Sequence, residues 1–322
     1  MTSTNTDTQS VPASSPAPPH TPTVVFARPT KLKAKDPEIV QPGKTKALIY
    51  GASGVGKTWF TMSFPTPYFI DTEGGADLLH YQKRLKEANG AYFGPADGAL
   101  DFDTVIDQMK ALATEKHPFK TLIIDSITKL YQTAIADASD RLGDKDVFGA
   151  SKKPAIAGMR RVVNWAARLD MNVWFVAHET NEWGMDPKTG QRAEVGKMSD
   201  VWDKLIYELD LTLQAVKRGP DRNAIVRKSR LIGFPDLANF PLDYAEFATR
   251  YGKDFIEAAP VAIVLASAEQ VAEIKRLLDV VKIDDTEAVK VLTKAGADDW
   301  TELNTAQADA VIKWLGKKIS GK

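Results

Sequence analysis

The sequence predicts an α/β protein with a mostly parallel central sheet, and three observations predict this class. Short apolar runs alternate with longer amphipathic stretches from about residue 46 onward. A glycine-rich segment joins the first of these runs to a helical pattern. Two further runs, over residues 67–71 and 121–125, each end in an aspartate. Short buried strands that alternate with amphipathic helices are typical of parallel sheets whose faces are covered by helices.

The individual elements follow from the same patterns. We expect buried strands at the four short apolar runs, over residues 47–50, 67–71, 121–125 and 173–177. The amphipathic stretches predict helices over residues 57–63, 76–88, 102–115, 127–141 and 154–170. Two later strand-like runs, 209–216 and 224–231, are separated only by the polar turn 218–222. This predicts an antiparallel hairpin at the edge of the sheet.

Composition and periodicity divide the chain into three segments. Residues 1–40 are rich in Ser, Thr and Pro without periodicity, so we expect a disordered tail. Residues 41–260 carry the α/β pattern and form the predicted main domain. Residues 261–322 predict a small C-terminal module of three helices, over residues 268–281, 286–295 and 306–317. Asp285 and Thr305 are the predicted N-caps of the second and third helices.

Composition limits the classes of function. The chain has 322 residues, of which 43% are hydrophobic, enough for a sizeable core. Basic and acidic residues both total 42, which argues against a protein that coats nucleic acid through its overall charge. The absence of cysteine excludes disulfides, thiolate metal sites and cysteine nucleophiles. The first residues do not resemble a signal peptide and the longest apolar stretch is short, so we expect a cytoplasmic protein without a membrane span.

The glycine-rich segment predicts a phosphate-binding loop. It occupies the positions between the first strand and the first helix, which are Gly51, Ala52, Ser53, Gly54, Val55, Gly56, Lys57 and Thr58. Glycines let backbone N–H groups turn toward phosphates, and the positive end of the following helix adds to the attraction. Lys57 is expected to reach the terminal phosphates during catalysis, and Thr58 to offer its hydroxyl to magnesium. The segment therefore predicts binding of ATP with Mg²⁺.

Acidic residues at two strand ends complete the predicted site. Asp125 closes the run Thr-Leu-Ile-Ile-Asp, at the carboxyl end of a strand that lies beside the phosphate loop in such sheets. An aspartate there holds the magnesium shell. Glu73 follows the run Tyr-Phe-Ile-Asp and is placed to orient and deprotonate the water that attacks the terminal phosphate. We therefore predict an ATPase.

Taken together, Phe-Ile-Asp-Thr-Glu-Gly, Leu-Ile-Ile-Asp-Ser and the phosphate loop resemble the RecA and RadA recombinases. The resemblance covers roughly residues 45–235 and implies a RecA-like P-loop NTPase fold. It implies that Glu73 is the catalytic glutamate and Asp125 the magnesium-shell aspartate. His178 stands where the family has a residue that senses the terminal phosphate, and a histidine held by local hydrogen bonds is the alternative. The match is closer to the shorter RecA-like ATPases of bacteriophages, which would place the protein in the host cytoplasm.

Residues 217–230 are the most basic stretch of the chain, with six basic residues against one acidic. Strand alternation places Lys228 and Arg230 on one side of the second hairpin strand. In RecA-like assemblies the nucleotide lies between subunits, so we predict that these two cations act on the site of a neighbouring subunit in a ring or filament. Contact with a nucleic-acid backbone and a solvated edge strand remain alternatives.

The segment 179–197 is polar and contains three glycines, which predicts a long loop. The resemblance implies that this position lines the DNA-binding axis. Lys188, Arg192 and Lys197 are the candidate phosphate contacts, and Trp183 is the candidate for stacking on a base. The favoured interpretation is a DNA-stimulated ATPase that acts on single-stranded DNA in recombination or annealing. A ring-forming helicase or helicase loader and a switch or scaffold with little hydrolysis remain alternatives, and the C-terminal helices are a candidate site for a protein partner.

Overall fold

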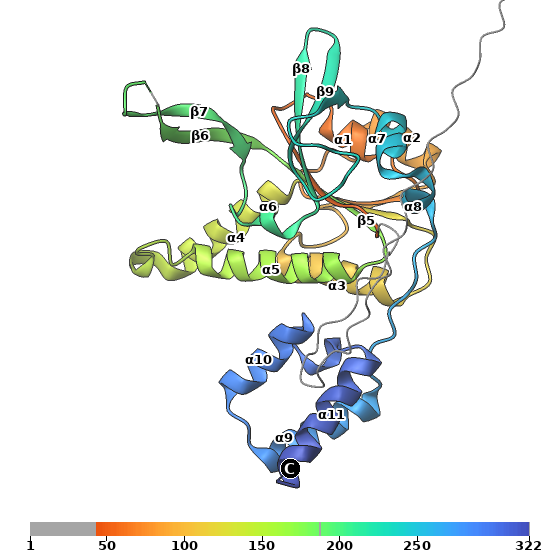
Figure 1. Cartoon of the computed structure of the whole chain (residues 1–322), viewed down its shortest axis with the longest axis vertical. Coiled ribbons are helices and arrows are strands. Elements are labelled where there is room, and N and C mark those ends of the chain that lie inside the picture. Colours follow the sequence, from red (N-terminus) through yellow and green to blue (C-terminus); the bar gives the residue numbers. More distant parts are fainter. Residues whose placement is uncertain (1–42, 187, 322) are drawn as a thin grey trace, which may run out of the picture. The chain divides into compact units, whose positions relative to one another are not determined.

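The computed structural model describes residues 43–186 and 188–321, so the tail predicted over residues 1–40 lies outside the described part. Within that part, eight strands form one sheet in the order β10-β9-β8-β1-β5-β4-β2-β3 (Figure 1). The strands from β8 to β3 in this order are parallel, whereas β9 and β10 are antiparallel additions at one edge. The eight strands are β1 (Lys46–Tyr50), β2 (Pro67–Asp71), β3 (Ala91–Phe93), β4 (Thr121–Asp125), β5 (Asn172–Ala177), β8 (Leu211–Arg218), β9 (Asp221–Ser229) and β10 (Asn239–Pro241).

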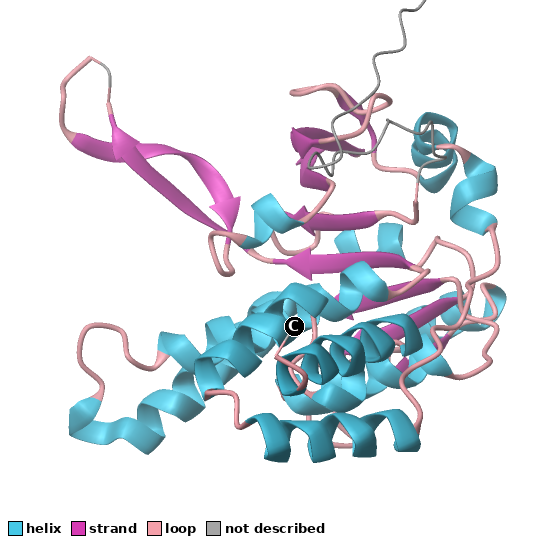
Figure 2. Ribbon diagram, turned by 60° about the horizontal axis from the view of Figure 1, so that its bottom comes forward, coloured by secondary structure: helices cyan, strands magenta, loops and turns pink. Residues whose placement is uncertain are grey.

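Helices cover both faces of the sheet, as Figure 2 shows. One face packs against α3, α4 and α5, and the other against α1, α2 and α7. The helices of the α/β region are α1 (Lys57–Thr61), α2 (Leu79–Glu87), α3 (Phe102–Thr114), α4 (Ile127–Leu142), α5 (Lys152–Arg168), α6 (Leu205–Glu208), α7 (Tyr244–Tyr251) and α8 (Lys253–Glu257). This arrangement confirms the predicted α/β class with a mostly parallel central sheet. The predicted hairpin forms from β8 and β9, and the short strand β10 lies outside it at the edge of the sheet.

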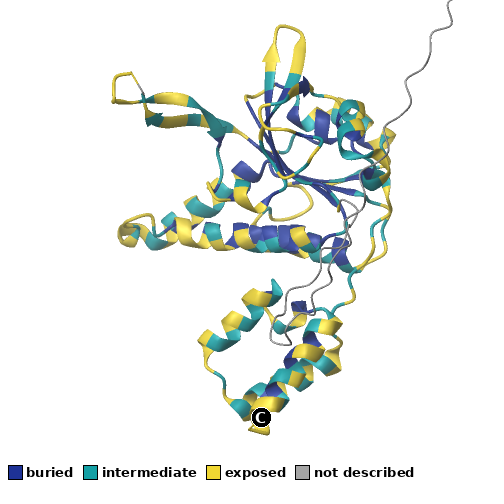
Figure 3. Cartoon of the chain, in the orientation of Figure 1, coloured by how far each residue is buried: buried dark blue, intermediate teal, exposed yellow. Residues whose placement is uncertain are grey.

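The buried residues are concentrated in the sheet and on the helix faces that meet it (Figure 3). Every residue of β4 and β5 is buried, which is the pattern of central strands covered on both sides. Alternate residues of β1 serve the two faces, with Leu48 in the cluster under α3 to α5 and Ile49 in the cluster under α1 and α7. The site at the strand ends therefore rests on a rigid base.

An aromatic cluster fixes the helix that follows the phosphate loop. Phe60 of α1 meets Trp174 of β5 edge to face, with ring centres 5.3 Å apart. Phe247 of α7 packs against both, at 6.0 Å from Phe60 and 5.3 Å from Trp174. Because α1 has only five residues, it is too short to be stable alone and depends on this packing.

The loop predicted over residues 179–197 is wrong, because the segment forms an antiparallel hairpin. Strands β6 (Glu179–Met185) and β7 (Arg192–Ser199) pair along their length as a separate two-stranded sheet. We call this hairpin the ribbon; it projects away from the main sheet in Figures 1 and 2. Few of its residues are apolar, so only two short alternating stretches, Trp183-Gly-Met185 and Ala193-Glu-Val195, marked it in the sequence.

Several element boundaries differ by a few residues from the predictions, and two of these differences have clear local reasons. Helix α2 begins at Leu79 instead of residue 76, because the Asp71 carboxylate accepts hydrogen bonds from the N–H groups of Gly74 and Ala76 and holds a turn there. The hairpin turn is tighter than predicted, since Arg218 and Asp221 already pair across β8 and β9.

The C-terminal region contains α9 (Ala268–Val281), α10 (Asp285–Ala295) and α11 (Thr305–Ile319), which share a small core of their own. The predicted N-caps are wrong by one residue. Asp284 caps α10 by accepting from the Glu287 N–H at 2.6 Å. Asn304 caps α11 by a reciprocal exchange of hydrogen bonds with Gln307. In each case the earlier polar residue reaches the third N–H of the helix, which is the usual geometry of a cap.

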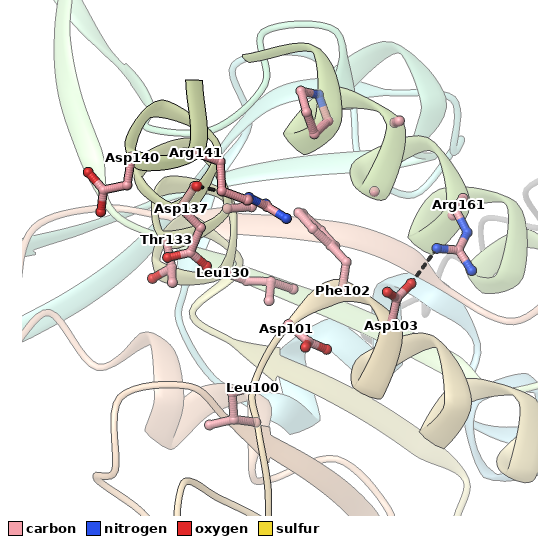
Figure 4. A pocket seen from close by; sticks show the side chains of 14 residues that line it. Leu100, Asp101, Phe102, Asp103, Leu130, Thr133, Asp137, Asp140, Arg141 and Arg161 are labelled. Carbon is pink, nitrogen blue, oxygen red and sulfur yellow. Dashed lines mark hydrogen bonds and ion pairs between the residues drawn. The ribbon is translucent and has the colours of Figure 1, made fainter. Parts of the chain in front are cut away.

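A hollow of about 700 Å³ lies among the start of α3, one side of α4 and the N-terminal part of α5 (Figure 4). Its lining mixes apolar side chains with acidic ones, and Arg161 pairs with Asp103 there at 2.6 Å. None of the residues predicted for the nucleotide site lines it. No helix among the described residues is long and apolar enough to cross a membrane.

Close packing beside this hollow gives a stability prediction. A methyl group added to Gly158 would lie 2.4 Å from the Phe102 ring, so Gly158→Ala should destabilise the protein by about 1–3 kcal/mol through overpacking. Gly316 in α11 is the matched control, because a methyl group there meets nothing within 4 Å. Gly316→Ala should stabilise by about 0.5–1 kcal/mol through helix propensity. Urea unfolding followed by circular dichroism measures both changes, and equal shifts in the two variants would contradict the packing argument.

Candidate active site

The phosphate loop is held in shape by close contacts that only glycine permits. Gly56 has φ +99°, a conformation that disfavours other residues. A side chain on Gly51 would come 2.4 Å from the carbonyl oxygen of Ala215 in β8. The Lys57 ammonium is buried under the loop and donates to the carbonyls of Gly51 and Ala52 at 2.8 and 2.9 Å. Burial lowers the pKa of Lys57, and the carboxylates of Asp125 and Glu73 oppose that shift.

Thr58 and Asp125 come together as predicted, although strand β5 separates β1 from β4 in the sheet. The Thr58 hydroxyl donates to Asp125 Oδ2 at 2.5 Å. Burial raises the pKa of Asp125 to about 6, and the hydrogen bond from Thr58 partly offsets that rise. A buried carboxylate with few partners is stabilised by a nearby cation, so the pair fits a magnesium ion shared with phosphate oxygens.

Glu73 lies beside this pair and is positioned by two neighbours. The Ser126 hydroxyl donates to Glu73 Oε1 at 2.5 Å, and His178 Nε2 lies 2.7 Å from the same oxygen. The His178 backbone N–H donates to Thr128 Oγ1, which fixes the end of β5 against the start of α4. The side chain of Glu73 remains partly exposed, so its carboxylate is accessible to a water molecule.

The structure thus assembles the predicted loop, Glu73, Asp125 and His178 at the carboxyl ends of four neighbouring strands, β1, β5, β4 and β2. Two supporting residues were missed in the sequence. Asp71 anchors the turn that presents Glu73 by accepting from its N–H at 3.0 Å. Ser126 bonds to Glu73 and also caps α4 through the Lys129 N–H. The available signals were the Asp of Asp-Thr-Glu-Gly-Gly, which is typical of a turn, and the Ser directly before a helix, which is typical of an N-cap.

Lys228 and Arg230 are not brought to this site. The sheet register places Lys228 opposite Thr212, which in turn is level with Leu48 in the middle of β1. Both side chains reach one segment of the same chain: Lys228 donates to the Leu209 carbonyl, and Arg230 donates to the Tyr207 carbonyl at 2.5 Å. Burial lowers the pKa of Lys228, and the neighbouring Arg230 charge adds to the effect. Their action on a neighbouring subunit stays a prediction.

The ribbon carries the residues that the sequence predicts to contact nucleic acid. The side chain of Trp183 is 55% exposed, and the Arg192 guanidinium lies 5.7 Å from its ring centre. Lys197 is instead bound within the ribbon, to Asn181 Oδ1 at 2.5 Å and Glu194 Oε1 at 2.7 Å. Lys188 is exposed near the turn. The ribbon therefore presents Trp183 and Arg192 together on its surface, while Lys197 is already neutralised.

The arrangement can bind a nucleotide with its metal and activate water. In the described residues no group of three or more His, Asp or Glu side chains could enclose a metal ion. The oxygens of Thr58 and Asp125, which lie 2.5 Å apart, would hold a magnesium together with the nucleotide phosphates. Such an ion supplies charge neutralisation at the phosphates. Lys57 is placed to bind phosphate oxygens once it leaves the loop carbonyls, and Glu73 is placed to accept a proton from water.

Comparison with known proteins agrees with this geometry. Residues 43–232, more than half of the chain, match the AAA domain family. No curated protein matches the sequence. The match spans the phosphate loop, Glu73, Asp125 and His178. The chain therefore belongs to the AAA domain family and carries a nucleotide-binding ATPase domain of the P-loop type.

Proposed function

We propose that the protein is a RecA-like ATPase whose hydrolysis of Mg-ATP is stimulated by single-stranded DNA, and that it serves recombination or single-strand annealing in a bacteriophage. The proposal includes assembly of several copies into a ring or filament. It rests on the resemblance of three motifs to the RecA and RadA recombinases, and above all on one contact between the active site and the ribbon.

That contact is the one between His178 and Glu73. His178 directly precedes β6, so the residue at 2.7 Å from the catalytic glutamate also begins the ribbon. A second connection runs from the end of β1, directly before the phosphate loop, since the hydroxyl of Tyr50 donates to the Lys197 carbonyl at 3.2 Å. The base of the ribbon is therefore attached to both sides of the nucleotide site. Binding of DNA to the ribbon would favour one arrangement of Glu73, and nucleotide would favour one arrangement of the ribbon.

The ribbon offers the chemistry that single-stranded DNA needs. Trp183 has an exposed ring on which a base can stack, and Arg192 beside it can neutralise a phosphate. Stacking is independent of sequence because every base has a flat π-face. Lysine and arginine do not outnumber the acidic residues of the ribbon. The proposed contact with DNA is therefore local and does not involve a broad basic surface.

The test is steady-state ATP hydrolysis with and without single-stranded DNA, with Lys57→Ala as the blank. We expect a several-fold stimulation that the blank lacks. Trp183→Ala should weaken DNA binding about 10-fold, from the lost stacking, and reduce stimulation at fixed DNA concentration while leaving the DNA-free rate unchanged. Tyr207→Ala is the control, an exposed aromatic outside the ribbon. Turnover that ignores DNA would contradict the proposal and favour a protein-directed loader or switch.

A further inference from the structure

Two cations of the β8–β9 hairpin face the phosphate loop, at the end opposite to Lys228 and Arg230. Lys217 and Arg222 are direct cross-strand partners and so point to the same side of the hairpin. Alternation puts them on the side of Ala215 and Ala224, which are buried in the cluster that also holds Val55 of the loop. Lys217 and Arg222 thus lie on the same side of the hairpin as these buried alanines but closer to its tip, and both side chains are exposed.

Arg222 touches the loop itself. A methyl group placed on Gly56 would lie 3.0 Å from Arg222 Cδ and 3.3 Å from its Nε. The hairpin is held there by the close approach of Ala215 to Gly51 and by the hydrogen bond from the Leu242 N–H to the Arg222 carbonyl. The guanidinium therefore lies against a loop whose backbone is shaped to bind phosphate.

Within the described part of the chain, no acidic side chain balances the charges of Lys217 and Arg222. None of the ion pairs among the described residues includes Lys217 or Arg222. The Arg222 guanidinium makes a long contact of 3.5 Å to the Pro220 carbonyl. Like charges directly opposite on a hairpin are destabilising, whereas the adjoining pair on the other side of the hairpin, Arg218 and Asp221, is of opposite charge. An anion between Lys217 and Arg222 would remove the repulsion.

We infer that Lys217 and Arg222 bind the polyphosphate of the nucleotide held by the phosphate loop of their own subunit. This inference rests on the proposed use of ATP and adds two binding residues to the site. The contact is made within one subunit, in contrast to the role predicted for Lys228 and Arg230. A guanidinium that already lies on the loop needs little rearrangement to reach a phosphate oxygen, and a charge-assisted hydrogen bond follows.

The test is calorimetric titration of the full chain with Mg-ADP. Arg222→Ala should weaken binding about 10- to 100-fold, the range for loss of a hydrogen bond to a charged group, and the double variant with Lys217→Ala should weaken it further. Arg222→Lys should retain part of the affinity because it keeps the charge. Arg218→Ala on the other side of the hairpin is the matched control and should bind Mg-ADP like the unmodified chain. Circular dichroism checks that each variant is folded.

Three outcomes would overturn the inference. The first is unchanged Mg-ADP affinity in Arg222→Ala while Lys57→Ala has lost binding; the proposed function would then survive. The second is loss of single-stranded DNA binding in Arg222→Ala with nucleotide affinity intact, which would make the pair a nucleic-acid contact. The third is recovery of hydrolysis when Arg222→Ala is mixed with Lys57→Ala, since a cation that acts within one subunit cannot be supplied by another. Absence of Mg-ADP binding by the unmodified chain would overturn the proposed function as well.

Discussion

Glu73→Gln should reduce the turnover number for ATP at least about 100-fold while nucleotide affinity changes little, because a positioned general base contributes roughly that factor. The amide keeps the size of the carboxylate and can still accept from Ser126, so the turn at the end of β2 should be preserved. What it loses is the ability to take a proton from water. Phosphate release measures the rate, and calorimetry with Mg-ADP measures the affinity.

A matched carboxylate separates this role from a general effect of charge. Glu87 lies on the exposed side of α2, so Glu87→Gln removes one negative charge without touching the site. It should hydrolyse ATP like the unmodified protein. Normal turnover in Glu73→Gln would show that another group, or water alone, accepts the proton, and the assignment of Glu73 would then be wrong.

Lys57→Ala should abolish measurable hydrolysis and weaken Mg-ADP binding by about two orders of magnitude or more. The Lys57 ammonium is buried beneath the phosphate-binding backbone, where a charge is worth more than at the surface. Its removal also leaves the carbonyls of Gly51 and Ala52 without their donor. Affinity and rate should therefore fall together, unlike in Glu73→Gln.

The control for this change is Lys153→Ala, an exposed lysine of α5. It should leave both affinity and rate unchanged. A thermal melt of each variant distinguishes loss of the ligand contact from loss of the fold. If Lys57→Ala remained folded and still hydrolysed ATP at a measurable rate, the phosphate loop would not be the site of the reaction.

The core of the site was predictable because its signals are local. The phosphate loop is a continuous segment, and Asp125 and Glu73 each follow a short apolar strand. Parallel strands place their carboxyl ends at one edge of the sheet, so a residue at such an end belongs to the site without further information. The hydrogen bonds from Thr58 to Asp125 and between His178 and Glu73 follow from that geometry.

The rest depends on pairing between distant segments. Six cations lie in and beside the β8–β9 hairpin, and the sequence does not state which of them reach the phosphate loop. The parallel register of β8 on β1 determines which cations lie near the loop. Because Tyr50 pairs with Gln214, the tip of the hairpin extends beyond the end of β1, beside the phosphate loop, whereas the base of the hairpin lies farther away. Lys228 and Arg230 are at the base, and Arg222 is near the tip.

Helix α7 shows the opposite case, a signal that was present in the sequence but not used. Asp243 caps the helix, and Tyr244, Phe247 and Tyr251 recur at helical spacing. The signal for the ribbon was weaker, because its strands hold few apolar residues. Its backbone pairing and its polar contacts, such as that of Lys197 with Asn181, leave no clear pattern in the sequence.

The aromatic cluster extends the nucleotide-binding unit past the segment that defines its family. The family match ends at residue 232, whereas Phe247 of α7 packs against both Phe60 and Trp174. A fragment cut at the end of the match would leave those two rings facing water and the short helix behind Lys57 without its support. The smallest piece of this chain that keeps a working phosphate loop therefore has to run at least through α7.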